Sequence, residues 1–156
     1  MKCYRVSKRK FAVGDLFPLS NWSLYVQKNG NPAANHYEQK LEDLRIETNP
    51  LAQKRDVCLF AFEKLEDAEG FALKKEENHY IYELETKVGH FSIHNYNITS
   101  YMLKYISNND ISGIDSHHHL MRLYWLERDE DTYYGREIGD TPELIINTPP
   151  VVTNVY

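Results

Sequence analysis

The chain of 156 residues has few of the residues that mark well-known catalytic motifs. Its 7 glycines are scattered, so no glycine-rich loop is present to hold a nucleotide phosphate, which argues against ATP-type and Rossmann-type chemistry. There is no Gly-x-Ser-x-Gly nucleophile motif. The only 2 cysteines, Cys3 and Cys58, lack the Cys-x-x-Cys spacing and lie in apolar, strand-like surroundings. They are predicted to be buried free thiols in a reducing compartment.

Long apolar segments are also missing. No apolar run approaches the roughly 18 residues of a membrane-spanning helix, and no apolar segment typical of a signal peptide follows Met1. We therefore expect a cytoplasmic protein without a membrane partner. The consecutive histidines at 117–119 point in directions about 100° apart on a helix, so they cannot all bind one ion. A solvated helix start is the better interpretation, and no metal is expected.

Charge is unevenly distributed along a chain whose net charge is −5. Residues 1–28 carry six cations against Asp15, a net charge of +5, whereas residues 122–156 carry a net charge of −4. The two segments attract each other if they are adjacent in space; otherwise the first forms a basic patch that could meet phosphates. The negative total argues against a general nucleic-acid-binding protein, although an RNA-binding role for residues 1–28 stays open.

The hydrophobic pattern predicts a single α+β domain spanning residues 1–156. Strands are predicted at 2–7, 56–62, 79–84, from about 143, and at 151–155, and residues 22–26 are predicted as a loop or short strand. Helices are predicted at about 36–46, at 64–73 and at 100–107, the last capped by Thr99 or Ser100. A further helix is predicted after an Asp115 cap, with Leu120, Leu123 and Tyr124 on one face. Aromatic residues make up 13% of the chain, including 12 tyrosines, which suits a ligand pocket or interface as well as ordinary β-structure.

Two charged residues lie in apolar strands and are candidates for a site. Arg5 is in the middle of the first strand, where an unpaired charge is costly, so it needs either an internal carboxylate or an anionic ligand such as a phosphate. Glu143 begins an apolar strand directly after Pro142, where it is either solvated at the strand end or the acid of an active site. A Glu near the C-terminus facing an N-terminal Arg on a neighbouring strand is the clearest functional indication.

Several segments together resemble the small ADP-ribosyltransferase superfamily, which includes rifampin-type, DNA-modifying and RNA 2′-phosphotransferase members. They are, in order, Tyr-Arg-Val-Ser at 4–7, Val-Gly-Asp at 13–15, Leu-Phe-Ala-Phe at 59–62 leading into a helix, His-Tyr-Ile-Tyr-Glu-Leu at 79–84, Tyr-Trp at 124–125, and Pro-Glu-Leu-Ile-Ile at 142–146 followed by Pro-Pro-Val-Val. The resemblance implies a compact α+β fold with a split sheet flanked by short helices.

The resemblance also implies roles for individual residues. In that superfamily a first-strand His or Arg holds NAD, a second strand and its helix lie beside the nicotinamide, and a late-strand Glu stabilises the oxocarbenium-like ribose. The implied positions are Glu143 as catalytic acid; Arg5, Tyr4, Ser7, Phe60, Phe62 and Tyr124 at the NAD; and residues 127–142, with Tyr133, Tyr134 and Glu137, as the loop that selects the target. Phe60, Ala61 and Phe62 depart from the usual Ser-Thr-Ser, and Thr141 stands where arginine-modifying members have a second acid.

The expected function is therefore NAD-dependent mono-ADP-ribosyl transfer, with NAD as substrate, no metal, and an acceptor that is a macromolecule or a small molecule. Glu137 stays open as an alternative to Glu143. One competing hypothesis is a non-catalytic nucleotide-binding module of the same fold. Another is a protein-interaction module, such as an inhibitor or antitoxin-like protein, using a patch of Trp22, Tyr25, Tyr133 and Tyr134.

Overall fold

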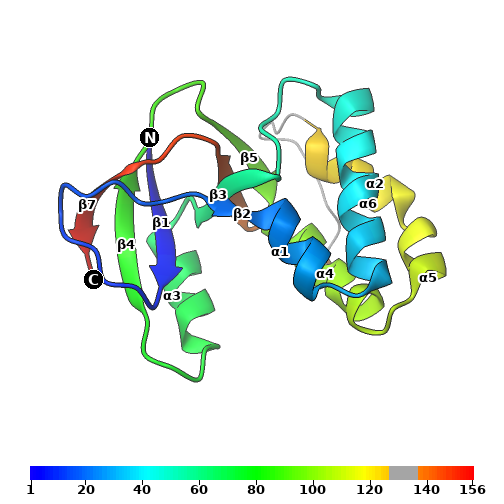
Figure 1. Ribbon diagram of the computed structural model, residues 1–156, viewed down its shortest axis with the longest axis horizontal. Helices are drawn as coiled ribbons and strands as arrows, with labels where there is room; N and C mark the ends of the chain where they lie inside the picture. The colour runs from blue at the N-terminus through cyan, green and yellow to red at the C-terminus, as the bar shows by residue number, and fades with distance from the viewer. Residues whose placement is uncertain (127–136) are drawn as a thin grey trace.

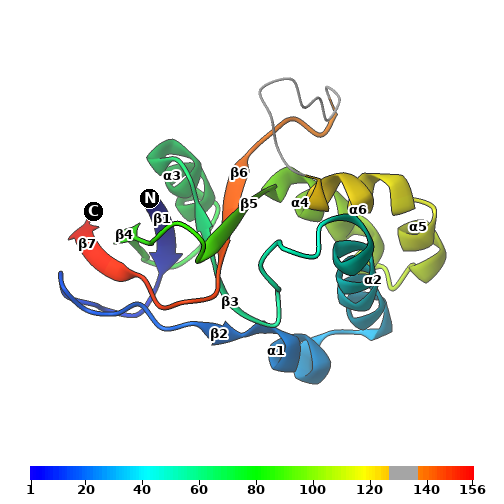
Figure 2. The same cartoon turned by 90° about the horizontal axis from the view of Figure 1, so that it is seen from above.

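The computed structural model describes residues 1–126 and 137–156, which form a mixed α+β fold around an antiparallel sheet. The strands are β1 (Lys2–Ser7), β2 (Ser20–Asn21), β3 (Val57–Phe62), β4 (Tyr80–Glu85), β5 (Phe91–Asn95), β6 (Pro142–Ile146) and β7 (Val151–Val155). The helices are α1 (Trp22–Asn29), α2 (Pro32–Thr48), α3 (Leu65–Leu73), α4 (Tyr96–Ser107), α5 (Ile111–Asp115) and α6 (His118–Trp125). Five helices gather beside one end of the sheet, and α3 lies apart from them against β1 and β3 (Figures 1 and 2).

The sheet has the strand order β5-β6-β3-β1-β4-β7, with β2 paired to β3 outside this path. β1 and β4 pair along six residues, from Lys2 opposite Glu85 to Ser7 opposite Tyr80. In contrast, β1 and β3 are joined in register at a single pair, Tyr4 opposite Phe62. The β1–β3 junction, the split region of the sheet, is therefore its least paired place and lies between β5-β6-β3 and β1-β4-β7.

Side-chain alternation along the strands divides the core between two sides of the sheet. Leu59, Ala61, Leu144 and Ile146 pack with Cys3 in one cluster, under Phe17, Tyr82 and Val152. Their neighbours Cys58 and Ile145 point to the opposite side and pack with buried residues of α2, α4, α5 and α6. A third cluster places Val6 and Phe62 under Ala68 of α3. Every second residue of β3 and of β6 therefore faces the helices.

The predicted strands at 2–7, 56–62, 79–84, 143 onward and 151–155 are confirmed, with shifts of one residue, as is the helix at 64–73. Cys3 and Cys58 are free and fully buried, as expected. No helix within residues 1–126 and 137–156 is long and apolar enough to cross a bilayer.

Three predictions of local structure were wrong near helix starts. Residues 22–26 form the first turns of α1, because the Asn21 side chain accepts a hydrogen bond from the Leu24 amide and caps the helix. The helix predicted at 36–46 begins at Pro32, which follows an Asn31 cap in the arrangement typical of proline at the first helical position. The cap of α4 is Asn95 and not Thr99 or Ser100.

The region around the histidines also differs from the prediction. The helix predicted with Leu120, Leu123 and Tyr124 is α6, but the residue at its cap position is His117 and not Asp115. Asp115 ends the short α5, which Asp110 caps by accepting a hydrogen bond from the Gly113 amide. Asp115 instead accepts hydrogen bonds from Lys40 and His36 of α2. His117 precedes α6, and His118 and His119 are exposed in its first turn, in agreement with a solvated helix start. β5 was not predicted at all.

Candidate functional site

A cavity of about 570 Å³ lies between the helices and the split region of the sheet. This volume is within the range of small-molecule sites. The lining is largely apolar and aromatic, and includes Val6, Trp22, Tyr25, Tyr37, Cys58, Phe60, Ala61, Phe62, Phe71, Tyr96, Leu103 and Ile106. Four charged residues interrupt it: Arg5, Glu38, Arg55 and Glu143. A small number of charged groups that point into an apolar cavity is typical of a site that binds a polar ligand in one orientation.

Arg5 reaches this cavity from the place where the sheet splits. Its Nη1 donates a 2.8 Å hydrogen bond to the carbonyl of Phe60, just beyond the single register pair of β1 and β3. Its buried Nε has no hydrogen-bond partner among the described residues. Burial lowers the pKa of Arg5, and the negative charge of Glu143 opposes this shift. A guanidinium with a free, buried N–H is suited to an anionic ligand.

Glu143 is on the helix-facing side of β6 and is buried, not solvated at the strand end. The Tyr124 hydroxyl on α6 donates a 3.0 Å hydrogen bond to its Oε1. No donor within residues 1–126 or 137–156 bonds to Oε2, so this oxygen is available to a ligand. Burial raises the pKa of the Glu143 carboxyl, whereas Arg55, the Tyr124 hydrogen bond and Arg5 each lower it.

The expectation that Arg5 and Glu143 occupy neighbouring strands was wrong, because β3 lies between β1 and β6. Glu143 is directly opposite Phe62 in the β3–β6 register, and Phe62 is opposite Tyr4. The two charges nevertheless line one cavity and act on each other electrostatically.

An ion pair between Arg55 and Glu38 forms another part of the wall and was missed in the sequence. Arg55 Nε and Nη2 donate to Glu38 Oε2 and Oε1 at 3.0 and 2.9 Å. Arg55 Nη1 donates to the Tyr124 hydroxyl at 2.6 Å and lies 4.0 Å from Glu143 Oε1. Burial alone would lower the pKa of Arg55, but Glu38 and Tyr124 more than offset it, and the pKa is raised well above its ordinary value.

The predicted aromatic residues divide into two groups. Phe60 and Phe62 line the cavity, where Phe60 also lies 4.7 Å below the Arg55 guanidinium and Phe62 makes an edge contact with Tyr96. Tyr124 is fully buried, with its ring stacked on His94 at 4.8 Å, so it touches the site through its hydroxyl and not through a ring face. Stacking on a ligand therefore falls to rings on β3, α1 and α4.

The predicted residues Tyr4, Ser7 and Glu137 lie outside the cavity lining. Tyr4 contacts Tyr156 and packs with the α3 cluster, and the Ser7 hydroxyl accepts a hydrogen bond from the Arg9 amide. Glu137 is exposed and does not line the cavity. Tyr133 and Tyr134 fall outside the described residues. Trp22 and Tyr25, predicted as an interaction patch, stack on each other at 5.5 Å at the cavity rim.

Two further polar groups face the cavity. These are the buried hydroxyls of Tyr37 on α2 and Thr99 on α4, which are close enough to act on each other by hydrogen bonding. Together with Arg5 Nε, they add polar atoms to a lining that is otherwise largely apolar.

No group of three or more His, Cys, Asp or Glu side chains within the described parts of the chain is arranged to hold a metal ion. The cavity lining provides instead one carboxylate with a free oxygen, two guanidinium groups and several aromatic faces. Such a site can bind a molecule with a planar ring and an anionic group and stabilise a positive charge next to Glu143. Comparison of the chain with models of known protein families gives no match, and comparison with curated protein sequences gives none either.

Proposed function

We propose that this chain is an NAD-dependent mono-ADP-ribosyltransferase, with Glu143 as its catalytic acid and Arg5 as an NAD-binding residue. The observation that carries the proposal is that the Glu143 carboxylate and the unpartnered Nε of Arg5 line the same aromatic cavity. An ordinary buried ion pair would satisfy both groups with each other. In this cavity each keeps an atom free of protein partners among the described residues, which favours a ligand between them.

The order of the elements supports the same proposal. The superfamily that the sequence resembles uses a cation on its first strand, a second strand that runs into a helix, and a Glu on a late strand. In this chain the cation is on β1, β3 leads directly into α3, and the Glu is on β6. The weak pairing between β1 and β3 agrees with the split sheet that the resemblance implies.

The proposed reaction needs little from the protein beyond charge and position. The bond between nicotinamide and C1′ of the ribose breaks, its electron pair leaves with the nicotinamide, and positive charge develops on the ribose. The Glu143 carboxylate stabilises this charge in a site with little water. An acceptor oxygen or nitrogen then bonds to C1′ and loses its proton. Rings such as Phe60 and Phe62 hold the nicotinamide by stacking.

The test is release of nicotinamide from NAD by the wild type and by Glu143→Gln. We choose Gln because Glu143 is buried and hydrogen-bonded to Tyr124, so a truncation to Ala would also open a hole. Loss of one electrostatic stabiliser is expected to lower turnover about 10²–10³-fold or more. Glu85→Gln, at the exposed end of β4, is the matched control and should keep wild-type turnover.

Glu137→Gln separates the two candidate acids, because Glu137 is exposed and outside the cavity lining. Turnover lost in Glu137→Gln and kept in Glu143→Gln would move the acid to residue 137. An acceptor that is absent from the assay can silence a transferase, so thermal melts with and without NAD accompany the assay.

A stabilised melt without turnover would favour the second candidate, a non-catalytic nucleotide-binding module of the same fold. No shift and no turnover would favour an interaction module. The observation behind that third possibility is that Tyr25, 58% exposed, stacks on Trp22 at the cavity rim, where an aromatic pair could serve a protein partner.

A further inference from the structure

Glu143 is linked to α2 through a continuous chain of short contacts. Glu38 on α2 accepts two hydrogen bonds from Arg55, and Arg55 Nη1 donates to the Tyr124 hydroxyl, which donates to Glu143 Oε1. Trp22 Nε1 adds a 2.9 Å hydrogen bond to Glu38 Oε1. The side chains of Arg55 and Glu143 are 7% and 8% exposed, and Glu38 is 19% exposed, so bulk water screens these contacts poorly.

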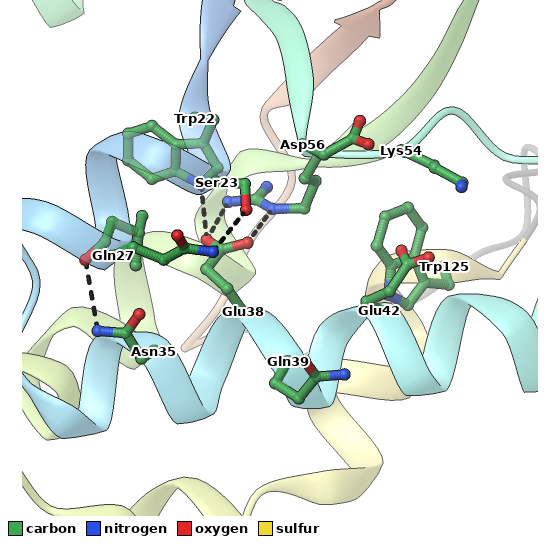
Figure 3. A pocket seen from close by; sticks show the side chains of 12 residues that line it. Trp22, Ser23, Gln27, Asn35, Glu38, Gln39, Glu42, Lys54, Asp56 and Trp125 are labelled. Carbon is green, nitrogen blue, oxygen red and sulfur yellow. Dashed lines mark hydrogen bonds and ion pairs between the residues drawn. The ribbon is translucent and has the colours of Figure 1, made fainter.

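Glu38 also lines a second, smaller hollow of about 240 Å³. Figure 3 shows Glu38 reaching up from α2 toward Trp22, with Gln27, Asn35 and Gln39 around it. The Arg55–Glu38 pair lines both hollows. The two parallel hydrogen bonds of this pair leave the guanidinium little freedom to turn.

We propose that Arg55 and Tyr124, held in place by Glu38, are positioning residues that fix Oε1 of Glu143 and keep its carboxylate charged, so that Oε2 is presented to the ribose of the substrate. The assignment of the ribose rests on the function proposed above. The fixing and charging of Glu143 do not, because they follow from the contacts within the protein.

The need for such residues follows from the position of Glu143. A carboxylate in an apolar wall tends to take up a proton, since burial disfavours its charged form. A protonated Glu143 would not stabilise positive charge. Arg55 opposes protonation at 4.0 Å, and the Tyr124 hydroxyl opposes it by donating to Oε1. The free-energy balance between burial and these two contacts sets the pH at which the acid is active.

Other groups around Glu143 act on the same balance. Arg5 on β1 favours the charged form, and Glu38 disfavours it by like-charge repulsion. The titratable groups facing this region from the remaining elements are Tyr37 on α2, Cys58 on β3, Tyr96 on α4, and His94, the register partner of Glu143 on β5. None of these bonds to Glu143 Oε1 as Tyr124 does.

Tyr124→Phe is the sharpest test, because it removes one hydroxyl and keeps the buried ring. The Glu143 carboxyl is followed by NMR in ¹³C-glutamate-labelled protein without NAD, and its signal is identified by its absence in Glu143→Gln. We expect the titration midpoint to rise by about one pH unit, since a hydrogen bond to a charged group is lost. Arg55→Met should raise it as well. Tyr105→Phe, which loses a hydroxyl contact to His117 outside the cavity, is the control and should not.

The second readout is the pH dependence of NAD cleavage. In Tyr124→Phe the acid limb of the kcat profile should move up with the NMR midpoint. At pH values below that midpoint kcat should fall about tenfold, while KM for NAD changes less than about twofold. A Glu143 midpoint unchanged in Tyr124→Phe overturns the inference, even if the protein is destabilised or Arg55→Met fails to fold. If the wild type does not cleave NAD but the Glu143 midpoint still rises in Tyr124→Phe, the proposed function and the assignment of the ribose are overturned. The inference that Arg55 and Tyr124 keep the Glu143 carboxylate charged is then still supported.

Discussion

The hydroxyl of Tyr124 on α6 lies 3.0 Å from Oε1 of Glu143 on β6, and this contact ties the helices to the sheet at the wall of the cavity. The Tyr124 ring is held between His94 and Trp125, with ring centroids 4.8 and 5.0 Å away. Its hydroxyl therefore has little freedom to move. Since the contact fixes one oxygen of the acid and leaves the other open, the orientation of Glu143 depends on how α6 packs.

Arg5 gives the first prediction, which concerns ligand binding. Replacing Arg5 by Gln should weaken NAD binding about 10- to 100-fold, because charge-assisted hydrogen bonds contribute roughly 1.5–3 kcal/mol. The residual affinity would come from the aromatic lining. Isothermal titration calorimetry of NAD into the wild type and the variant measures the change.

Ser7→Ala is the control for Arg5, because Ser7 is on the same face of β1 and does not line the cavity. Its affinity for NAD should match that of the wild type. Equal losses in the two variants would mean that the β1 backbone is disturbed and that Arg5 has no special contact. Unchanged affinity in Arg5→Gln would remove Arg5 from the binding site.

The second prediction is a pH-dependent stability effect at Glu143. Because its pKa is raised in the folded protein, the folded state binds more protons than the unfolded state above about pH 4.5, and stability is lost as the pH rises through the folded pKa. Glu143→Gln removes this loss. The melting temperature of Glu143→Gln, relative to that of the wild type, should therefore rise with pH above about 4.5, until the Glu143 carboxyl of the folded wild type is ionised.

Thermal melts across this range, followed by circular dichroism, provide the measurement. Glu76→Gln, an exposed position between α3 and β4, should show a difference that stays nearly constant with pH. If Glu143→Gln instead became less favourable toward neutral pH, Arg55 and Tyr124 would outweigh burial, and the folded pKa of Glu143 would be lowered and not raised.

The sequence predicted those elements whose local pattern matches their surroundings. The apolar run from Val57 to Phe62 is a strand with both faces covered, and the spacing of Ala68, Phe71 and Ala72 matches a helix packed on it. α1 was missed because Trp22, Tyr25 and Val26 have strand-like propensities, and the Asn21 cap decides the outcome. β5 was missed because His94 and Asn95 are buried polar residues, whose partners at Tyr124 and Gly139 lie far along the chain.

The candidate site was predictable only in part. An Arg in an apolar strand and a Glu at the start of another are visible in the sequence, and both line the cavity. Glu38 looks like any solvated helix residue, and Arg55 like a polar residue before a strand. Arg55 is buried and Glu38 is largely covered because α1, α2 and the start of β3 converge, which brings Trp22 and Arg55 to the carboxylate of Glu38. The sequence around each of these residues gives no indication that the three segments meet.

The third prediction concerns the two thiols. Burial raises the pKa of Cys3 and of Cys58 to about 12, so almost no thiolate is present near neutral pH. The thiolate is the reactive form, and neither sulfur is exposed. The native protein should resist iodoacetamide for hours, and both thiols should react after unfolding in guanidinium, as counted by intact mass. Ser107→Cys on the exposed end of α4 is the positive control. Rapid labelling of Cys58 would instead show that its cavity opens.

The last prediction uses two glycines whose surroundings differ. Gly70 is inside α3, and an added Cβ would meet nothing within 4 Å, so Gly70→Ala should stabilise the fold by about 0.4–1 kcal/mol. Gly113 is inside α5, where a Cβ would lie 2.4 Å from both Asp110 Oδ2 and Tyr105 Cδ1. Asp110 caps α5 through the Gly113 amide, so Gly113→Ala must displace the cap, whose loss costs about 1 kcal/mol.

Urea unfolding measures both effects: the midpoint concentration of urea should rise for Gly70→Ala and fall for Gly113→Ala. A gain in both would mean that helix propensity outweighs the cap in α5; a loss in both would mean that α3 packs more tightly at Gly70 than its open side indicates.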